Sequence, residues 1–315
     1  MTAGIRALRI VLALAIVLAL VEWVGPEGLF ERIAACPWPA ALAAFSTTLL
    51  AQWLGAARLC LLARSQALPL TQGQAMSIGL SAVFYGLFLP GGSATGWVVR
   101  LLRLAPSSGG IGTALVVLAA DRAVTTAIGA VIGVIAGSLM TPVAHPILTV
   151  LLFAIACFAA CFGALLLKPS LKAWVARGRR LPGLSRLMES LAGVPARRPE
   201  ARTIWLATAL SVALHAAGVV SWLFLARGLG LEIGVVALAW VRSAALLVTL
   251  LPASIGGLGL REGAVILLMS GMGIPSVEAL TLSLLVFAVT VLAVGVLGGI
   301  LEATRLVMRP PVAPA

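Results

Sequence analysis

Apolar residues are gathered in long segments that alternate with short connections containing charged residues, Gly or Pro. The segments are 5–24, 39–62, 71–89, 111–138, 147–167, 203–226, 233–251, 260–273 and 277–302. A helix needs about 20 apolar residues to cross a bilayer, and most of the segments approach that length. The pattern predicts an all-α integral membrane protein, with one polytopic domain over residues 1–305 and a disordered tail over 306–315.

The composition supports a membrane protein and excludes several other classes. Apolar residues make up 61% of the 315-residue chain, charged residues only 10%, and the mean hydropathy is +1.13. Because soluble domains carry about 25% charged residues, these values exclude a soluble enzyme, a disordered chain and a protein that binds nucleic acid.

The net charge is +12, and the positions of the basic residues along the chain predict the topology. Lys and Arg are retained in cytoplasmic loops, and the block 168–202 holds nine basic residues against two acidic ones. Both chain ends also carry Arg. We therefore expect a multi-pass protein of the cell inner membrane with a cytoplasmic basic loop and cytoplasmic N- and C-termini.

The first half contains one apolar segment too many for simple crossings. Three segments separate the basic end of 39–62 from the basic loop, and both ends are predicted to be cytoplasmic. One of the three must return to its own side. Segment 71–104 is interrupted by Pro90, Gly91 and Gly92, which predicts a re-entrant hairpin that enters and leaves at the cytoplasmic face.

The second half contains a similar interruption. Segment 233–273 is broken by a run that includes Pro252, Gly256 and Gly257, and the piece after the break is short for a span. Because the basic loop and the C-terminus are both predicted to be cytoplasmic, this hairpin is expected to enter from the face opposite to that of the first hairpin.

Two hairpins that enter from opposite faces predict an inverted repeat, with halves at about 39–167 and 203–302. The whole chain would then have about six full transmembrane helices and two re-entrant hairpins. Broken helices free backbone N–H and C=O groups, which are tolerated in a bilayer only inside protein or at a polar cavity. Paired breaks of this kind are typical of the central site of a transporter.

Asp121 and Arg122 lie near the middle of segment 111–138. Ionisable groups at that depth are costly and face an interior or a cavity. Adjacent side chains on a helix do not face each other, so each needs another partner. Two interpretations stay open: Arg122 binds a lipid phosphate and Asp121 a cation or headgroup amine, or each pairs with another helix.

Further candidate binding residues flank the breaks. Arg261 suits phosphate binding and Glu262 suits the first turn of a helix; the alternative is an interfacial Arg261 and a capping Glu262. Arg100 has the matching position in the first hairpin, as a phosphate ligand or a cytoplasmic anchor. Arg242, in the middle of its apolar segment, is expected to pair with Glu262 or Asp121, or to contact a headgroup.

Other polar residues are expected to have structural roles. His215 is predicted to be a neutral, hydrogen-bonded core residue, and Arg58 an interfacial anchor or a ligand of inner-leaflet phosphates. Arg103 is interpreted as a cytoplasmic anchor. The eight Trp residues mostly lie near segment ends, which predicts an interfacial belt. No catalytic set, Walker lysine or metal-ligand spacing is present, so we expect no enzyme activity, no cofactor and no metal.

Four stretches carry a resemblance to a known family. They are L-F-L-P-G-G at 87–92, Arg100, A-D-R at 120–122 and L-P-A-S-I-G-G-L-G-L-R-E-G at 251–263. They resemble the flippase-like transmembrane family related to the N-terminal domain of lysylphosphatidylglycerol synthases. The last stretch is the most specific. Two positions depart from the family pattern: Trp97 lies where an acidic residue is common, and Phe287 where an Arg is common.

The resemblance implies translocation of a membrane lipid, not aminoacyl transfer. The partner would be a phospholipid, a glycolipid or a polyprenyl- or hopanoid-type lipid, with its headgroup near Arg122, Arg261 and Glu262. Two alternatives remain: a secondary transporter of a small soluble solute, and a non-transporting scaffold for a lipid-modifying enzyme partner.

Overall fold

The computed structural model describes residues 22, 29–89, 92–108, 111–140, 146–166, 199–250 and 259–308. Within these ranges the secondary structure is helical, and the all-α prediction is confirmed. The helices are α2 (Leu29–Ala35), α3 (Trp38–Ser65), α4 (Gln72–Phe88), α5 (Ser93–Leu104), η1 (Ala105–Ser108), α6 (Ile111–Leu139), α7 (Pro146–Leu166), α10 (Ala201–Gly228), α11 (Val235–Leu250), α12 (Leu260–Ser270), α13 (Ser276–Phe287), η2 (Ala288–Leu292) and α14 (Ala293–Met308).

Four of the described helices are long and apolar enough to cross a membrane. They are Trp38–Ser65, Ile111–Leu139, Ala201–Gly228 and the continuous stretch Ser276–Arg305, which includes the π turn η2. Shorter apolar helices are present at Pro146–Phe162 and Val235–Ala245. This set supports a multi-pass membrane protein. The predicted first helix, the basic loop and the C-terminal tail lie largely or wholly outside the described residues.

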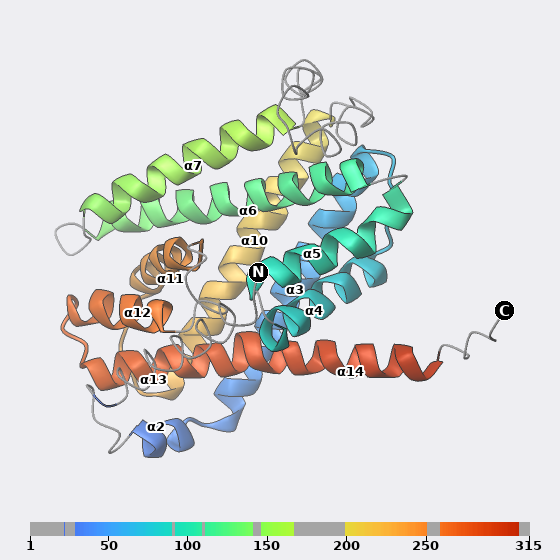
Figure 1. The fold of residues 1–315 in the computed structure, drawn as a ribbon. Helices are drawn as coiled ribbons and strands as arrows, with labels where there is room; N and C mark the ends of the chain where they lie inside the picture. Colours follow the sequence, from blue (N-terminus) through green and yellow to red (C-terminus); the bar gives the residue numbers. More distant parts are fainter. Residues whose placement is uncertain are drawn as a thin grey trace, which may run out of the picture.

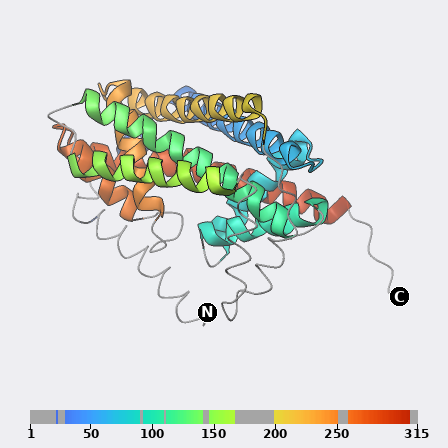
Figure 2. The same ribbon diagram turned by 90° about the horizontal axis from the view of Figure 1, so that it is seen from above.

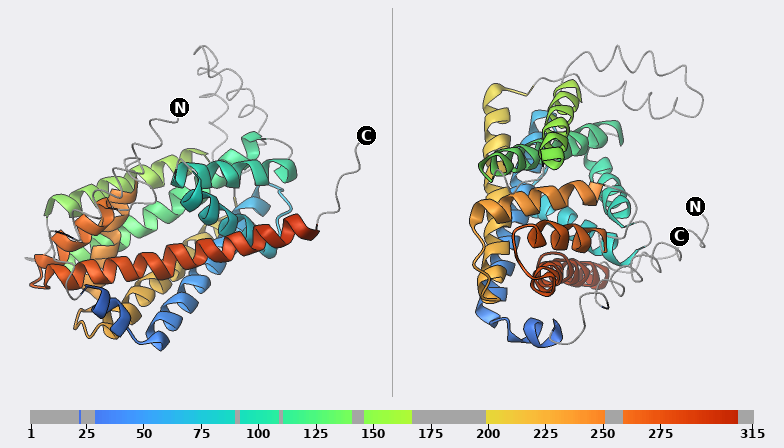
Figure 3. Two further views of the ribbon diagram at one scale, coloured as in Figure 1. Left: turned by 60° about the horizontal axis from the view of Figure 1, so that its bottom comes forward. Right: turned by 90° about the vertical axis from the view of Figure 1, so that its left-hand side faces the viewer.

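The helices form two layers (Figure 1). Helices α3 and α10 lie side by side and make one layer, whereas the other long helices run across it, as the right-hand view of Figure 3 shows. The view from above confirms that α10 and α3 occupy one side of the bundle (Figure 2). The pair is antiparallel, because Gly55 faces Leu214 while Gly228 faces Ala40. Opposite directions for these two spans agree with the charge-based topology.

The first predicted hairpin is present as two helices packed against each other. A Cβ atom on Gly96 of α5 would lie 2.5 Å from the carbonyl oxygen of Ala82 in α4, so only glycine permits this approach. Gly92, which precedes α5, has a positive φ of 57°, which also favours glycine. Pro90 and Gly91 lie outside the described residues. The helix–break–helix order is as predicted, and its placement in a bilayer stays a prediction.

The second predicted hairpin also consists of two packed helices, α11 and α12. The break between them, with Pro252, Gly256 and Gly257, lies outside the described residues. The short apolar piece after the break is confirmed as a separate helix, because α12 ends at Ser270 and a turn with Gly273 at φ 81° precedes α13.

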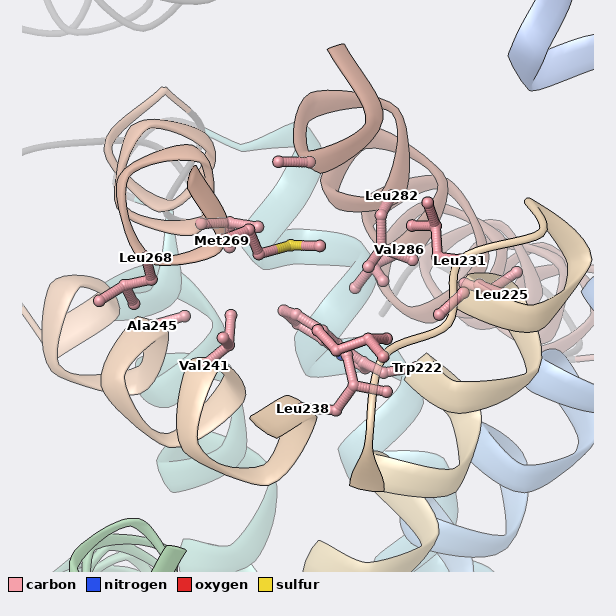
Figure 4. Close-up of a cluster of buried hydrophobic side chains, with 14 of the residues drawn as sticks. Trp222, Leu225, Leu231, Leu238, Val241, Ala245, Leu268, Met269, Leu282 and Val286 are labelled. Carbon is pink, nitrogen blue, oxygen red and sulfur yellow. The ribbon is translucent and has the colours of Figure 1, made fainter. Parts of the chain in front are cut away.

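A large apolar core fills the space among α10, α11, α12 and α13 (Figure 4). Trp222 of α10, Leu238 of α11, Met269 of α12 and Leu282 of α13 all contribute to it. Trp240 is also buried, with 1% of its surface exposed. The predicted interfacial belt is therefore wrong for these two Trp residues, because α10 and α11 are covered by neighbouring helices at these positions.

Candidate functional site

A cavity of 530 Å³ lies among α3, α4, α5, α6 and α10. Small residues create the space, including Ala51, Gly79, Ala82 and Gly86. Gly79 has no atom within 4 Å of the position that a Cβ would occupy. Hydrophobic side chains such as Leu59, Leu87, Leu118, Leu214 and Val291 form most of the remaining wall, so the polar residues at the cavity are few.

Arg58 of α3 and Asp121 of α6 form a buried ion pair beside this cavity. Arg58 Nε donates to Asp121 Oδ1 at 2.8 Å, and Arg58 Nη1 donates to Ser211 Oγ of α10 at 3.0 Å. The expected interfacial position of Arg58 is wrong, since only 3% of its surface is exposed. Asp121 compensates its charge across the helix interface. The pair joins three helices, as one interpretation of Asp121 required.

Arg100 and Arg122 also line the cavity and lie within the electrostatic influence of Asp121. In the described part of the chain, neither guanidinium has a hydrogen-bond or ion-pair partner. The described lining therefore carries three guanidinium groups and one carboxylate, from Arg58, Arg100, Arg122 and Asp121. This excess of two positive charges favours an anionic ligand. Three of the predicted binding residues, Arg100, Asp121 and Arg122, thus line one cavity, although 22 positions separate the first from the last.

Arg261 and Glu262 form a separate cluster and are not among the residues that line this cavity. Glu262 Oε2 accepts a hydrogen bond from the backbone N–H of Gly259 at 2.6 Å, which caps the start of α12. Arg261 contacts the Glu262 carboxylate and lies over the Phe287 ring, 5.3 Å from its centroid. The interfacial position considered for Arg261 is wrong, because its side chain is buried.

Phe287, one of the two departures from the family pattern, provides the aromatic face under this guanidinium. Arg261 Nη2 also donates to the backbone oxygen of Ser283 at 3.4 Å. These contacts tie α12 to α13. The sequence predicted Arg261 and Glu262 beside Arg122, and the structure places them in different parts of the bundle.

Arg242 bonds to His215, which corrects the expected pairing with Glu262 or Asp121. Arg242 Nη1 lies 3.0 Å from His215 Nδ1, and His215 Nε2 lies 2.9 Å from the carbonyl oxygen of Thr125. A guanidinium only donates hydrogen bonds, so Nδ1 accepts and the proton of a neutral ring is on Nε2. The prediction of His215 as a hydrogen-bonded core residue is confirmed.

Sequence reasoning missed a polar cluster around Glu302 of α14. Arg103 binds the Glu302 carboxylate through both terminal nitrogens, with Nη1 to Oε1 at 2.8 Å. Ser81 Oγ donates to Oε1 at 2.6 Å and Tyr85 OH to Oε2 at 3.2 Å. Arg103 is therefore an ion-pair partner that joins α4, α5 and α14, not a simple anchor. The available signal was an acidic residue at the end of an otherwise apolar segment.

No set of three potential metal ligands from His, Cys, Asp and Glu is brought together within the described ranges. The cavity offers three guanidinium groups, one carboxylate, the Gln52 amide and the Thr125 hydroxyl beside an apolar wall. Such an arrangement can bind an amphipathic anion through charge-assisted hydrogen bonds.

The comparison with protein families agrees with the motifs. No curated protein matches the sequence significantly. The sequence profile of the family described as the lysylphosphatidylglycerol synthase TM region matches residues 7–298, which is nearly the whole chain. The chain therefore belongs to the lysylphosphatidylglycerol synthase transmembrane-region family.

Proposed function

We propose that the protein translocates a membrane lipid whose anionic headgroup binds in the 530 Å³ cavity. The observation that carries the proposal is the excess of guanidinium groups at this cavity. Arg100 and Arg122 are the proposed headgroup ligands, because neither is paired within the described residues. Arg58 is already held by Asp121 and Ser211, so it contributes its charge from a fixed position.

A lipid fits this site better than a neutral sugar or a soluble cation. Arg binds phosphate oxygens in a bidentate manner, whereas the uncompensated positive charge repels cations. The largely apolar wall suits the part of the lipid next to the headgroup. Membership of a transmembrane family that is often linked to lipid flipping supports the same function. The two broken hairpins, proposed as an inverted repeat, would let the cavity be reached from either leaflet.

Removal of both free arginines tests the proposal. Proteoliposomes of phosphatidylcholine with a trace of phosphatidylglycerol that is fluorescently labelled on its acyl chain report translocation through quenching by external dithionite. We expect Arg100→Ala/Arg122→Ala to slow translocation at least about tenfold, since each charge-assisted hydrogen bond to phosphate contributes about 1.5–3 kcal/mol.

The matched control is Arg64→Ala/Arg227→Ala, which removes two exposed arginines that do not line the cavity. It should translocate the labelled lipid at the wild-type rate. Labelled phosphatidylcholine should move more slowly than labelled phosphatidylglycerol in the wild type. Equal rates for the cavity variant and the wild type, with both folded by gel filtration, would contradict the assignment.

A further inference from the structure

A second cavity, of 230 Å³, lies next to Gln52. It shares the wall residues Ala51, Gln52 and Leu214 with the larger cavity, but Arg100 and Arg122 do not reach it. Its charged residue is Arg242. The remaining polar residues at its surface are Thr48, Ser221 and Thr290, from α3, α10 and η2.

The charge of Arg242 is not neutralised by the described part of the protein. The guanidinium forms no ion pair there, and its hydrogen-bond partner, His215, is neutral when it accepts through Nδ1. The Arg242 side chain is partly buried, and a charge removed from water is costly without a counter-charge. Arg242 therefore faces the cavity as an uncompensated cation. An anionic ligand in the cavity would supply the missing negative charge.

Gly218 makes room for this guanidinium. A Cβ at position 218 would lie 2.4 Å from Arg242 Nη2, so any side chain would displace Arg242 from its place across α10. The hydroxyl groups of Thr48 and Ser221 both donate to the carbonyl oxygen of Ala44, at 2.8 and 2.9 Å. The Gln52 amide has no hydrogen-bond partner within the described residues, which leaves it available to a ligand.

We propose that this smaller cavity is a second anion-binding site, where Arg242 and the Gln52 amide hold one compact phosphate or carboxylate group. The anion can be a free ion or part of a lipid headgroup; both present the same oxygen acceptors. The proposal does not depend on lipid translocation, because its ligands differ from those at the larger cavity.

Calorimetric titration of inorganic phosphate into the purified full chain tests the site. The protein is held in phosphatidylcholine nanodiscs, and the blank is sodium chloride of equal ionic strength. We expect saturable phosphate binding at both cavities, and Arg242→Gln should weaken at least about tenfold the binding that Arg100→Ala/Arg122→Ala leaves intact. Gly218→Ala should weaken it similarly although it keeps every charge, because the added methyl group displaces the guanidinium.

Two controls locate the bound anion. Arg227→Gln removes an exposed arginine of α10 and should bind phosphate as the wild type does. Arg100→Ala/Arg122→Ala should also retain binding, which separates this site from the proposed headgroup site. Absence of saturable binding, unchanged binding in both Arg242→Gln and Gly218→Ala, or loss of binding in Arg100→Ala/Arg122→Ala would overturn the proposal.

The source of the anion follows from the same titration in nanodiscs that contain phosphatidylglycerol. A weaker apparent phosphate affinity in these discs identifies a lipid headgroup as a competing occupant of the site. An unchanged affinity identifies a free anion. Both results require the Arg242-dependent binding described above and support the site.

Discussion

Replacement of Arg58 by Ala is expected to lower the free energy of unfolding by about 3–5 kcal/mol, because it leaves the Asp121 carboxylate buried without its partner. Both side chains of the pair are buried, and Arg58 Nε lies 2.8 Å from Asp121 Oδ1. Ser211 would also lose the guanidinium that bonds to its Oγ at 3.0 Å. One substitution thus disturbs α3, α6 and α10 together. The thermal unfolding midpoint in detergent measures the loss.

Arg64→Ala is the matched control, since Arg64 lies on the same helix but is exposed. Its unfolding midpoint should stay near the wild-type value. The double variant Arg58→Met/Asp121→Leu should recover much of the lost stability, because an apolar pair leaves no unpaired charge. If Arg58→Ala unfolds at the same temperature as Arg64→Ala, the ion pair does not contribute to the fold as argued.

Replacement of Gly298 by Ala is expected to destabilise the protein by about 1–3 kcal/mol through overpacking. A Cβ there would lie 2.2 Å from the backbone oxygen of Leu80 in α4. A backbone oxygen cannot rotate away, so α4 and α14 must separate. The separation would also strain the contacts of Glu302 with Ser81 and Arg103, one turn further along α14.

Gly73→Ala provides the comparison for this variant. Gly73 is in α4, and nothing lies within 4 Å of the position of its missing Cβ. This variant should keep or slightly raise the unfolding midpoint, because Ala favours helix more than Gly does. A Gly298→Ala protein with the midpoint of Gly73→Ala would show that α4 and α14 are not packed as closely as described.

Local sequence patterns were sufficient for the long apolar helices and for the helix pairs on either side of the two breaks, whereas the short α2 lies in no predicted segment. Apolar segment length and the Pro/Gly interruptions are properties of neighbouring residues, so α4 with α5 and α11 with α12 follow from them. The sequence also indicated that Asp121 needs a partner, because a carboxylate within an apolar helix is costly. Burial and hydrogen bonding of His215 are confirmed for the same reason.

The partners of the charged residues could not be predicted in the same way. Arg58 and Asp121 are 63 positions apart, and Arg103 and Glu302 are 199 positions apart. Which charges meet depends on the rotation of each helix about its axis and on the register between helices. Those quantities arise from packing at small residues such as Gly218 and Gly298, whose positions along the chain carry no pairing information by themselves.

The two ion-paired clusters each hold one set of three helices together. Arg58 and its partners join α3, α6 and α10, and Glu302 and its partners join α4, α5 and α14. The large cavity has walls from both. A displacement of one set of helices against the other would change the shape of the cavity without breaking either cluster. Such a displacement would alter the separation between Arg100 on α5 and Arg122 on α6, so the affinity of the cavity for an anion would depend on the relative position of the two sets of helices.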